Sequence, residues 1–242
     1  MLHGGGGMGG GIRRMEFRRE SPDGIGARFA QLAAEAAACR LCPRMAGRTA
    51  VLTLRNGCLR PRVLFVAEAP GRRGADRTRV PLAGDATGKA FDVLLDSVGL
   101  QRTQIFITNA VLCNPRRVSG ANRPPLASEI SRCRAFLSRT IGLLDPPVVA
   151  ALGAVALRAL DGLERHGLAL KESAGRPVLW GQRVLVPLYH PSPQVLISRR
   201  SLEEQTRDWQ ALGAILAGGN PPGASPPRPT PRPPEVEAPR DR

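Results

Sequence analysis

The chain has 242 residues, 42% of them hydrophobic, which is enough to bury a core without disulfide bonds and too much for a wholly disordered protein. No apolar run approaches the roughly 20 residues that cross a bilayer, and the N-terminal stretch is not of signal-peptide type, so we expect a cytoplasmic protein without membrane contact. The net charge of +15, from 35 lysine and arginine residues against 20 acidic ones, favours a polyanionic partner and above all nucleic acid.

The composition predicts one folded domain between two tails. Residues 1–26 are rich in glycine and lack hydrophobic periodicity, so we expect a disordered N-terminal tail. Residues 218–242 are rich in proline, which predicts an extended and disordered C-terminal tail. Residues 27–217 are therefore expected to form the folded domain, and we expect that domain to be a monomer.

Within residues 27–217, short apolar runs alternate with helical patterns. Buried strands are predicted at residues 62–68, 104–109, 148–152 and 183–188. Helices are predicted at residues 29–38, 88–98, 127–144, 154–160 and 201–216. The last helix opens on a capping box formed by Ser201 and Glu204. This alternation predicts a parallel sheet with helices on both faces, and in such folds the ligand binds at the carboxyl ends of the strands.

Four of the five cysteines are candidate metal ligands. Cys39 and Cys42 form a C-x2-C pair, which in a cytosolic chain indicates metal or redox chemistry more often than a disulfide. Cys113 follows the second predicted strand and Cys133 lies in the next helix, and four thiolates suit either zinc or an iron–sulfur cluster. The spacing leaves both metals open, as well as the alternative that Cys113 and Cys133 are ordinary buried thiols. Cys58 follows a turn signal and is expected to be a bystander.

The loops after the predicted strands carry unusual motifs. The motifs, in chain order, are Glu68-Ala69-Pro70-Gly71, Gly84-Asp85-Ala86-Thr87-Gly88, Asn109 with Cys113, Asn122-Arg123-Pro124, Ala151-Leu152-Gly153, and His190-Pro191-Ser192-Pro193-Gln194. Together with Cys39-Arg40-Leu41-Cys42-Pro43 and Cys133, this ordered set resembles the iron–sulfur families four and five of the uracil-DNA glycosylase superfamily. The resemblance covers about residues 30–212 and mixes features of both families.

The resemblance implies a fold, a cofactor and an activity. The fold is an α/β, three-layer α/β/α sandwich with a central four-stranded parallel sheet. The cofactor is a [4Fe–4S] cluster held by Cys39, Cys42, Cys113 and Cys133. The activity is that of a DNA repair glycosylase, which flips a deaminated base out of DNA and hydrolyses its N-glycosidic bond to leave an abasic site. Water would be the nucleophile, because no lysine is placed to form a Schiff base, so we expect a monofunctional enzyme.

Two departures from the family pattern bear on the choice of base. The family's base-stacking Phe is Leu82 here, and the acidic residue of family four aligns with Gly74 or Ala75. Family five also has small residues at that place and accepts more bases. We therefore expect uracil as substrate, with hypoxanthine and xanthine as further candidates.

The expected base pocket is built around Asn109. Its side-chain amide both donates and accepts hydrogen bonds, which suits the edge of uracil, and the resemblance assigns it that role. We expect Leu82 to pack against the face of the base. The backbone that should line the pocket belongs to Ala69, Pro70 and Gly71.

The expected catalytic residues are two acids, a histidine and an amide. His190 could donate to O2 of the base as negative charge develops there. Asp85 or Glu68 would activate the water, and Asp85 is favoured because it matches the proposed catalytic carboxylate of family five. Asp85 could instead cap the helix that begins near residue 88. Asn122 is expected to assist.

The expected DNA contacts come from the basic and proline-rich loops. They are Ser192, Gln194, Arg116, Arg117, Arg123 and Arg199. Gln194 and the two residues after it are placed to fill the gap left by the flipped base.

Two other interpretations stay open at this point. The first is a catalytically inactive nucleic-acid-binding module with zinc or an iron–sulfur cluster, which the loss of the aromatic ring at Leu82 keeps open. The second is a relative that traps the sugar covalently, which would need a histidine near residues 116–121, where this chain has arginines and no histidine.

Overall fold

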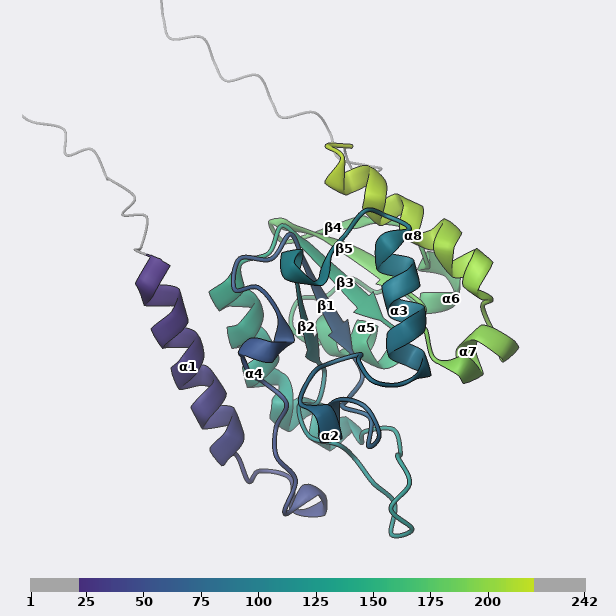
Figure 1. Cartoon of the computed structure of the whole chain (residues 1–242). Coiled ribbons are helices and arrows are strands. Elements are labelled where there is room, and N and C mark those ends of the chain that lie inside the picture. The colour runs from purple at the N-terminus through teal and green to yellow at the C-terminus, as the bar shows by residue number, and fades with distance from the viewer. Residues whose placement is uncertain (1–21, 220–242) are drawn as a thin grey trace, which may run out of the picture.

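The computed structural model describes residues 22–219 (Figure 1). Helix α1 spans Pro22–Ala38, so the folded part begins five residues before the boundary expected at residue 27. The predicted disorder of residues 1–21 and 220–242 lies outside the described residues.

One five-stranded sheet forms the centre of the molecule. Its strands are β1 (Val63–Ala67), β2 (Ile105–Asn109), β3 (Val148–Leu152), β4 (Val178–Trp180) and β5 (Arg183–Leu188), in the order β2-β1-β3-β5-β4. The four strands predicted from the sequence are present, and their mutual pairings are parallel. The expectation of four strands is corrected by β4, which pairs antiparallel with β5 at one edge. Three residues are too few to show an alternating pattern, so β4 gave no signal in the sequence.

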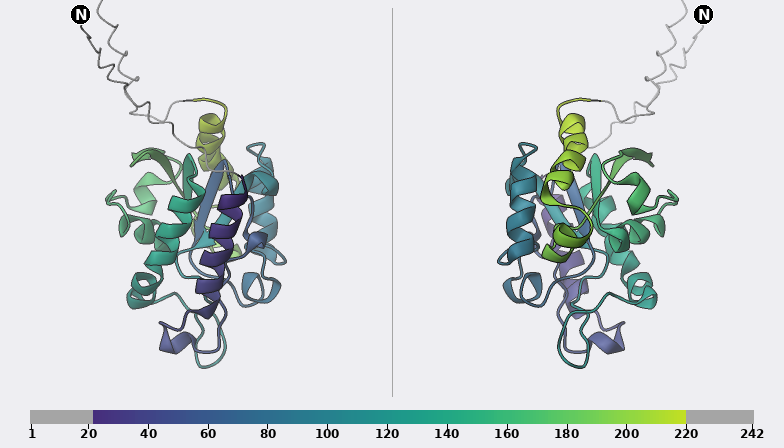
Figure 2. Two further views of the ribbon diagram at one scale, coloured as in Figure 1. Left: turned by 90° about the vertical axis from the view of Figure 1, so that its left-hand side faces the viewer. Right: turned by 90° about the vertical axis from the view of Figure 1, so that its right-hand side faces the viewer.

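Helices cover both faces of the sheet, as expected. They are α2 (Ala75–Thr78), α3 (Ala86–Asp96), α4 (Ala127–Leu144), α5 (Ala154–Asp161), α6 (Leu170–Ser173), α7 (Pro193–Ser198) and α8 (Leu202–Leu216). Helices α1, α4 and α5 cover one face and α3 and α8 the other (Figures 1 and 2). Among residues 22–219, no helix is long and apolar enough to cross a membrane.

The central strands are buried on both faces, which explains their continuous apolar runs. In β1, Leu64 and Val66 face the α1–α4–α5 layer, whereas Val63 and Phe65 face α3 and α8. Successive side chains of a strand point to opposite faces, so both faces need apolar residues here.

An aromatic cluster fixes α3 against the sheet. The ring of Phe91 in α3 meets Phe65 of β1 edge to face at 5.2 Å between centroids, and it meets Trp209 of α8 at 5.6 Å. Such pairs add about 0.5–1.5 kcal/mol each beyond their burial. They hold the N-terminus of α3 at a fixed place relative to the carboxyl end of β1, where the unusual loops gather.

The predicted capping box of α8 is present. Ser201 Oγ accepts a hydrogen bond from the amide of Glu204 at 3.2 Å, and the Glu204 carboxylate accepts from the amide of Ser201 at 2.8 Å. The loop after α7 therefore ends at Ser201, where the capping box begins helix α8.

Candidate functional site

A cavity of about 470 Å³ lies where the parallel strands end. Its walls include all nine residues predicted for catalysis and base binding, together with Ser192 and Gln194. These nine are Glu68, Ala69, Pro70, Gly71, Leu82, Asp85, Asn109, Asn122 and His190. They come from five separate segments, which only the parallel topology brings to one edge of the sheet.

Asp85 is the N-cap of α3, as one of the two sequence interpretations expected. Its Oδ1 accepts a hydrogen bond from the amide of Gly88 at 2.9 Å. The second oxygen, Oδ2, lies beside Gly74, where an added Cβ would come within 2.8 Å of it. Capping therefore uses one carboxylate oxygen and leaves the other for the cavity, so the two roles proposed for Asp85 are compatible. A side chain at position 74 would displace that second oxygen.

The backbone of Leu82 is held in an uncommon conformation at the cavity wall. Its φ of 47° lies in the left-handed region, which a bulky residue rarely adopts. The guanidinium group of Arg102 donates to the carbonyl oxygens of Leu82 and of Pro81. Its Nε also donates to Oδ1 of Asp92 at 2.7 Å. From the other side, Gly88 approaches so closely that an added Cβ would lie 2.6 Å from the Leu82 oxygen. This close packing explains why residue 88 is a glycine.

Gly88→Ala is expected to destabilise the protein by about 1–3 kcal/mol, because the new Cβ meets backbone atoms that cannot rotate away. Displacement of Leu82 and Asp85 should also slow any chemistry in the cavity. Gly142→Ala is the control, since its Cβ would meet nothing within 4 Å inside α4 and should stabilise by about 0.5–1 kcal/mol. Urea unfolding of both variants measures the difference, and equal midpoints would contradict the close packing of Gly88.

Burial sets the protonation of two groups in the cavity. It lowers the pKa of the half-buried His190 to about 4, although the nearby charge of Asp85 acts to raise it. The imidazole is therefore neutral at pH 7 and can donate from one ring nitrogen. Burial raises the pKa of Glu68, and the charge of Arg158 offsets this only in part. Glu68 thus holds its proton to higher pH than an ordinary glutamate.

Asn109 presents an unsatisfied donor. It is 4% exposed at the end of β2, and its Nδ2 is buried without a hydrogen-bond partner among the described residues. Leaving a buried amide unpaired costs about 1–3 kcal/mol, so a partner supplied by a bound ligand would stabilise this group. Because Asn109 lines the cavity, the missing partner would lie inside it.

Asn114, which the sequence analysis did not single out, ties two loops of the site together. The residue is buried, and its Nδ2 donates to the carbonyl oxygen of Pro70 and to Oδ1 of Asn122. The same Asn122 oxygen accepts from the backbone amide of Arg72 at 3.1 Å. The Asn122 side chain, expected to assist catalysis, is thus engaged in holding the loop after β1. The only sequence signal for Asn114 was its position in the loop after the second strand.

Two of the arginines predicted to contact DNA are held in internal ion pairs, and their contact with DNA stays a prediction. Arg123 binds the buried Glu129 through two hydrogen bonds of 2.8 and 2.6 Å, and Arg116 pairs with Asp76. Breaking the first pair would leave a buried charge uncompensated. Arg117 and Arg199 are exposed, and their contact with DNA stays a prediction.

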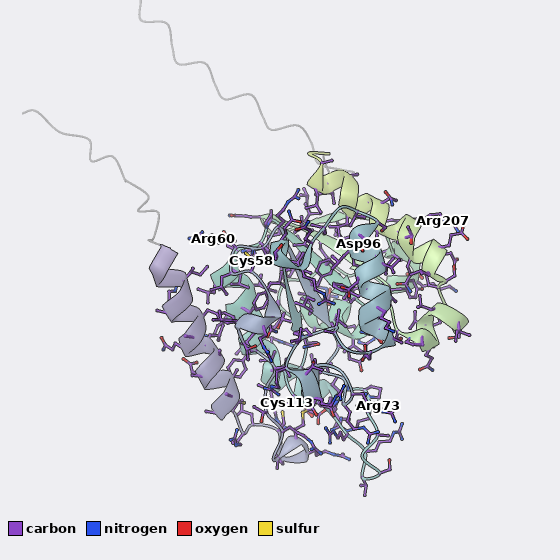
Figure 3. All side chains as sticks on the ribbon, in the orientation of Figure 1. Cys58, Arg60, Arg73, Asp96, Cys113 and Arg207 are labelled. Carbon is purple, nitrogen blue, oxygen red and sulfur yellow. The ribbon has the colours of Figure 1, made fainter. Side chains whose placement is uncertain are left out.

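A second cavity, of about 80 Å³, brings the four predicted cysteine ligands together. Cys39, Cys42, Cys113 and Cys133 all line it. Among the described residues, no three His, Cys, Asp or Glu side chains are arranged to hold a single metal ion. One water needs only about 10–15 Å³, so this cavity suits a larger group. Cys58 does not line this cavity and lies apart from Cys113 (Figure 3), and its expected role as a bystander stays a prediction.

Comparisons with known proteins show which family the chain is similar to. The sequence profile of the uracil DNA glycosylase superfamily matches residues 54–213. A Type-4 uracil-DNA glycosylase of Thermotoga maritima is 35% identical over 167 residues, which covers 68% of this chain and 81% of that protein. A Type-4 enzyme of Archaeoglobus fulgidus is 30% identical over 66% of this chain and 79% of its own length. A Type-5 uracil-DNA glycosylase of Thermus thermophilus is 31% identical over 75% of this chain and 94% of its own length.

Proposed function

The chain belongs to the uracil DNA glycosylase superfamily, and on that premise we propose that it removes uracil from DNA by hydrolysing the N-glycosidic bond. The observation that carries the proposal is the buried, unpaired Nδ2 of Asn109 at the wall of the larger cavity. An amide there can donate to O4 of a uracil ring and accept from its N3–H. The net charge of +15 supports a polyanionic substrate.

The proposed chemistry assigns one task to each polar group of the cavity. The target nucleotide is turned out of the duplex so that its base enters the cavity. Breaking the bond leaves negative charge on the base and positive charge on the sugar. His190, neutral at pH 7, donates a hydrogen bond to O2 of the departing base. Asp85 Oδ2 accepts a proton from the attacking water.

We also propose that the enzyme is monofunctional. A lyase step would need an amine nucleophile at the sugar. The chain has two lysines, Lys89 and Lys171, and neither lines the cavity. Water then remains as the nucleophile, and the product is an abasic site.

The base range of the cavity should be broad. Leu82 offers an aliphatic contact, which is less selective than an aromatic ring. Gly74 leaves no side chain between Asp85 and the base, since any Cβ there would meet the carboxylate. We therefore propose hypoxanthine and xanthine as further substrates.

Base release tests this proposal. Duplex and single-stranded oligonucleotides with one uracil, hypoxanthine, xanthine or thymine are incubated with the protein, and abasic sites are cleaved with alkali. We expect release of uracil and no release by Asn109→Ala. No release of any base by the unchanged protein, despite DNA binding, would favour the inactive nucleic-acid-binding module.

We further propose that Cys39, Cys42, Cys113 and Cys133 hold a [4Fe–4S] cluster. The proposal rests on the four thiols, which line one cavity of about 80 Å³, and on the capacity of four thiolates to hold such a cluster. With four protein ligands the cluster has no open coordination site, so its contribution would be structural. Cys113 lies in the loop that leads from Asn109, at the end of β2, to Asn114, so the cysteines would fix that loop against the N-terminal segment.

Cys113→Ser is expected to abolish the visible absorbance of the purified protein and to lower its iron content from about four atoms per chain toward zero. Cys58→Ser, which removes the cysteine outside the cavity, should change neither value. Iron analysis and absorbance spectra of anaerobically purified protein measure both. One zinc per chain in place of iron would contradict the cluster.

A further inference from the structure

Three arginines follow the Pro-Gly turn after β1 and surround a hollow beside the candidate site. Arg72, Arg73 and Arg77 line a cavity of about 490 Å³ together with Gly84 and Asp85. Arg72 and Arg73 also line a neighbouring cavity of about 430 Å³. That neighbouring cavity shares Gly71, Asp85, Thr87 and Asn122 with the cavity proposed to take the base. The arginines thus stand at the rim of the base site.

These arginines are not engaged in ion pairs of the kind that hold Arg116 and Arg123. All three are exposed, and none forms an ion pair with a described residue. Among residues 22–219, their guanidinium groups make one hydrogen bond, which Arg77 Nε donates to the carbonyl oxygen of Arg73 at 3.3 Å. Three like charges within six residues repel one another, so the arrangement favours an anion between them.

The position of these cavities suits the phosphate groups of a DNA strand. A nucleotide whose base fills the larger cavity carries a phosphate on each side of its sugar, only a few bonds from the base. Those phosphates would then lie near the rim of that cavity, and the hollows lined by arginine adjoin it. Guanidinium groups bind phosphate through two parallel hydrogen bonds.

We infer that Arg72, Arg73 and Arg77 bind the phosphates that flank the flipped nucleotide. This inference rests on the proposed function, because it takes the larger cavity as the base site. The backbone amide of Arg72 holds Asn122, so replacing the side chain leaves that bond in place.

The salt dependence of DNA binding tests the inference. The probe is a duplex with one tetrahydrofuran abasic analogue, which the protein cannot cleave. Arg72→Ala with Arg73→Ala should lower the slope of log Kd against log salt by about two, since each phosphate contact contributes about 0.9. The matched control is Arg60→Ala with Arg207→Ala, which removes the same charge from exposed positions far from Arg73 (Figure 3). We expect no change in slope for the control, and equal slopes for the two double variants would overturn the inference.

DNA with uncharged linkages at chosen positions shows which phosphates the arginines contact. Methylphosphonate linkages replace the two phosphates that flank the abasic analogue, or two phosphates six nucleotides away. The flanking replacement should weaken binding by the unchanged protein about tenfold or more, and it should have little further effect on the Arg72→Ala, Arg73→Ala variant. Additive losses at the flanking position would overturn the inference. Uracil release by the unchanged protein is measured in parallel, so a failure of the proposed function is seen separately from a failure of these contacts.

Discussion

Asp85→Asn is expected to slow uracil release by about 10²–10⁴-fold with little change in the free energy of unfolding. Asparagine caps helices as well as aspartate does, so the bond to the Gly88 amide and the N-terminus of α3 should persist. The amide cannot accept a proton from water, so only the chemical step should suffer. Single-turnover release at saturating enzyme measures the rate, and urea unfolding measures stability.

Glu68→Gln separates the two candidate carboxylates. Burial raises the pKa of Glu68 toward the range that suits a general base, so its role needs a direct test; with Asp85 as the base, we expect a loss below about tenfold. Asp96→Asn, an exposed acid at the other end of α3, is the control for loss of charge and should have no effect (Figure 3). A larger loss in Glu68→Gln than in Asp85→Asn would make Glu68 the base.

The location of the site could be predicted because it depends on topology more than on contacts. Continuous apolar runs marked the four parallel strands, and parallel strands place their carboxyl ends at one edge. Asn109 and His190, which are 81 positions apart in the sequence, follow two of those strands, and both line the larger cavity. No residue of the short edge strand β4 lines the larger cavity. The prediction of which residues gather there therefore did not depend on this strand.

The roles of the arginines could not be predicted from composition. With 35 basic residues, charge alone does not tell which guanidinium groups have acidic partners. Arg116 is paired with Asp76, which lies 40 residues earlier, and this contact exists only after folding. Asn114 was missed for the same reason, since its partners Pro70 and Asn122 come from two loops. Roles that depend on long-range partners become visible only in three dimensions.

His190→Gln is expected to slow uracil release by about 10²–10³-fold, the usual effect of removing one preorganised donor. The amide fills similar space, and it donates less well to the oxygen where charge develops. An affinity for the abasic-analogue duplex within about threefold of the unchanged protein would place the loss in the chemical step. A loss below tenfold would contradict the donor role.

The pH dependence of stability tests the neutral state of His190 independently of catalysis. Its pKa is about 4 in the folded protein against 6.5 for an ordinary histidine, so above pH 6.5 the ring is neutral in both folded and unfolded chains. As the pH falls from 6.5 to 4, the unfolded chain takes up a proton that the folded protein refuses, and stability declines. The decline should be steeper in the unchanged protein than in His190→Gln, which lacks the titrating ring. Parallel curves of unfolding free energy against pH would mean that the pKa of His190 is the same in the folded and unfolded chains, which would contradict the lowering by burial.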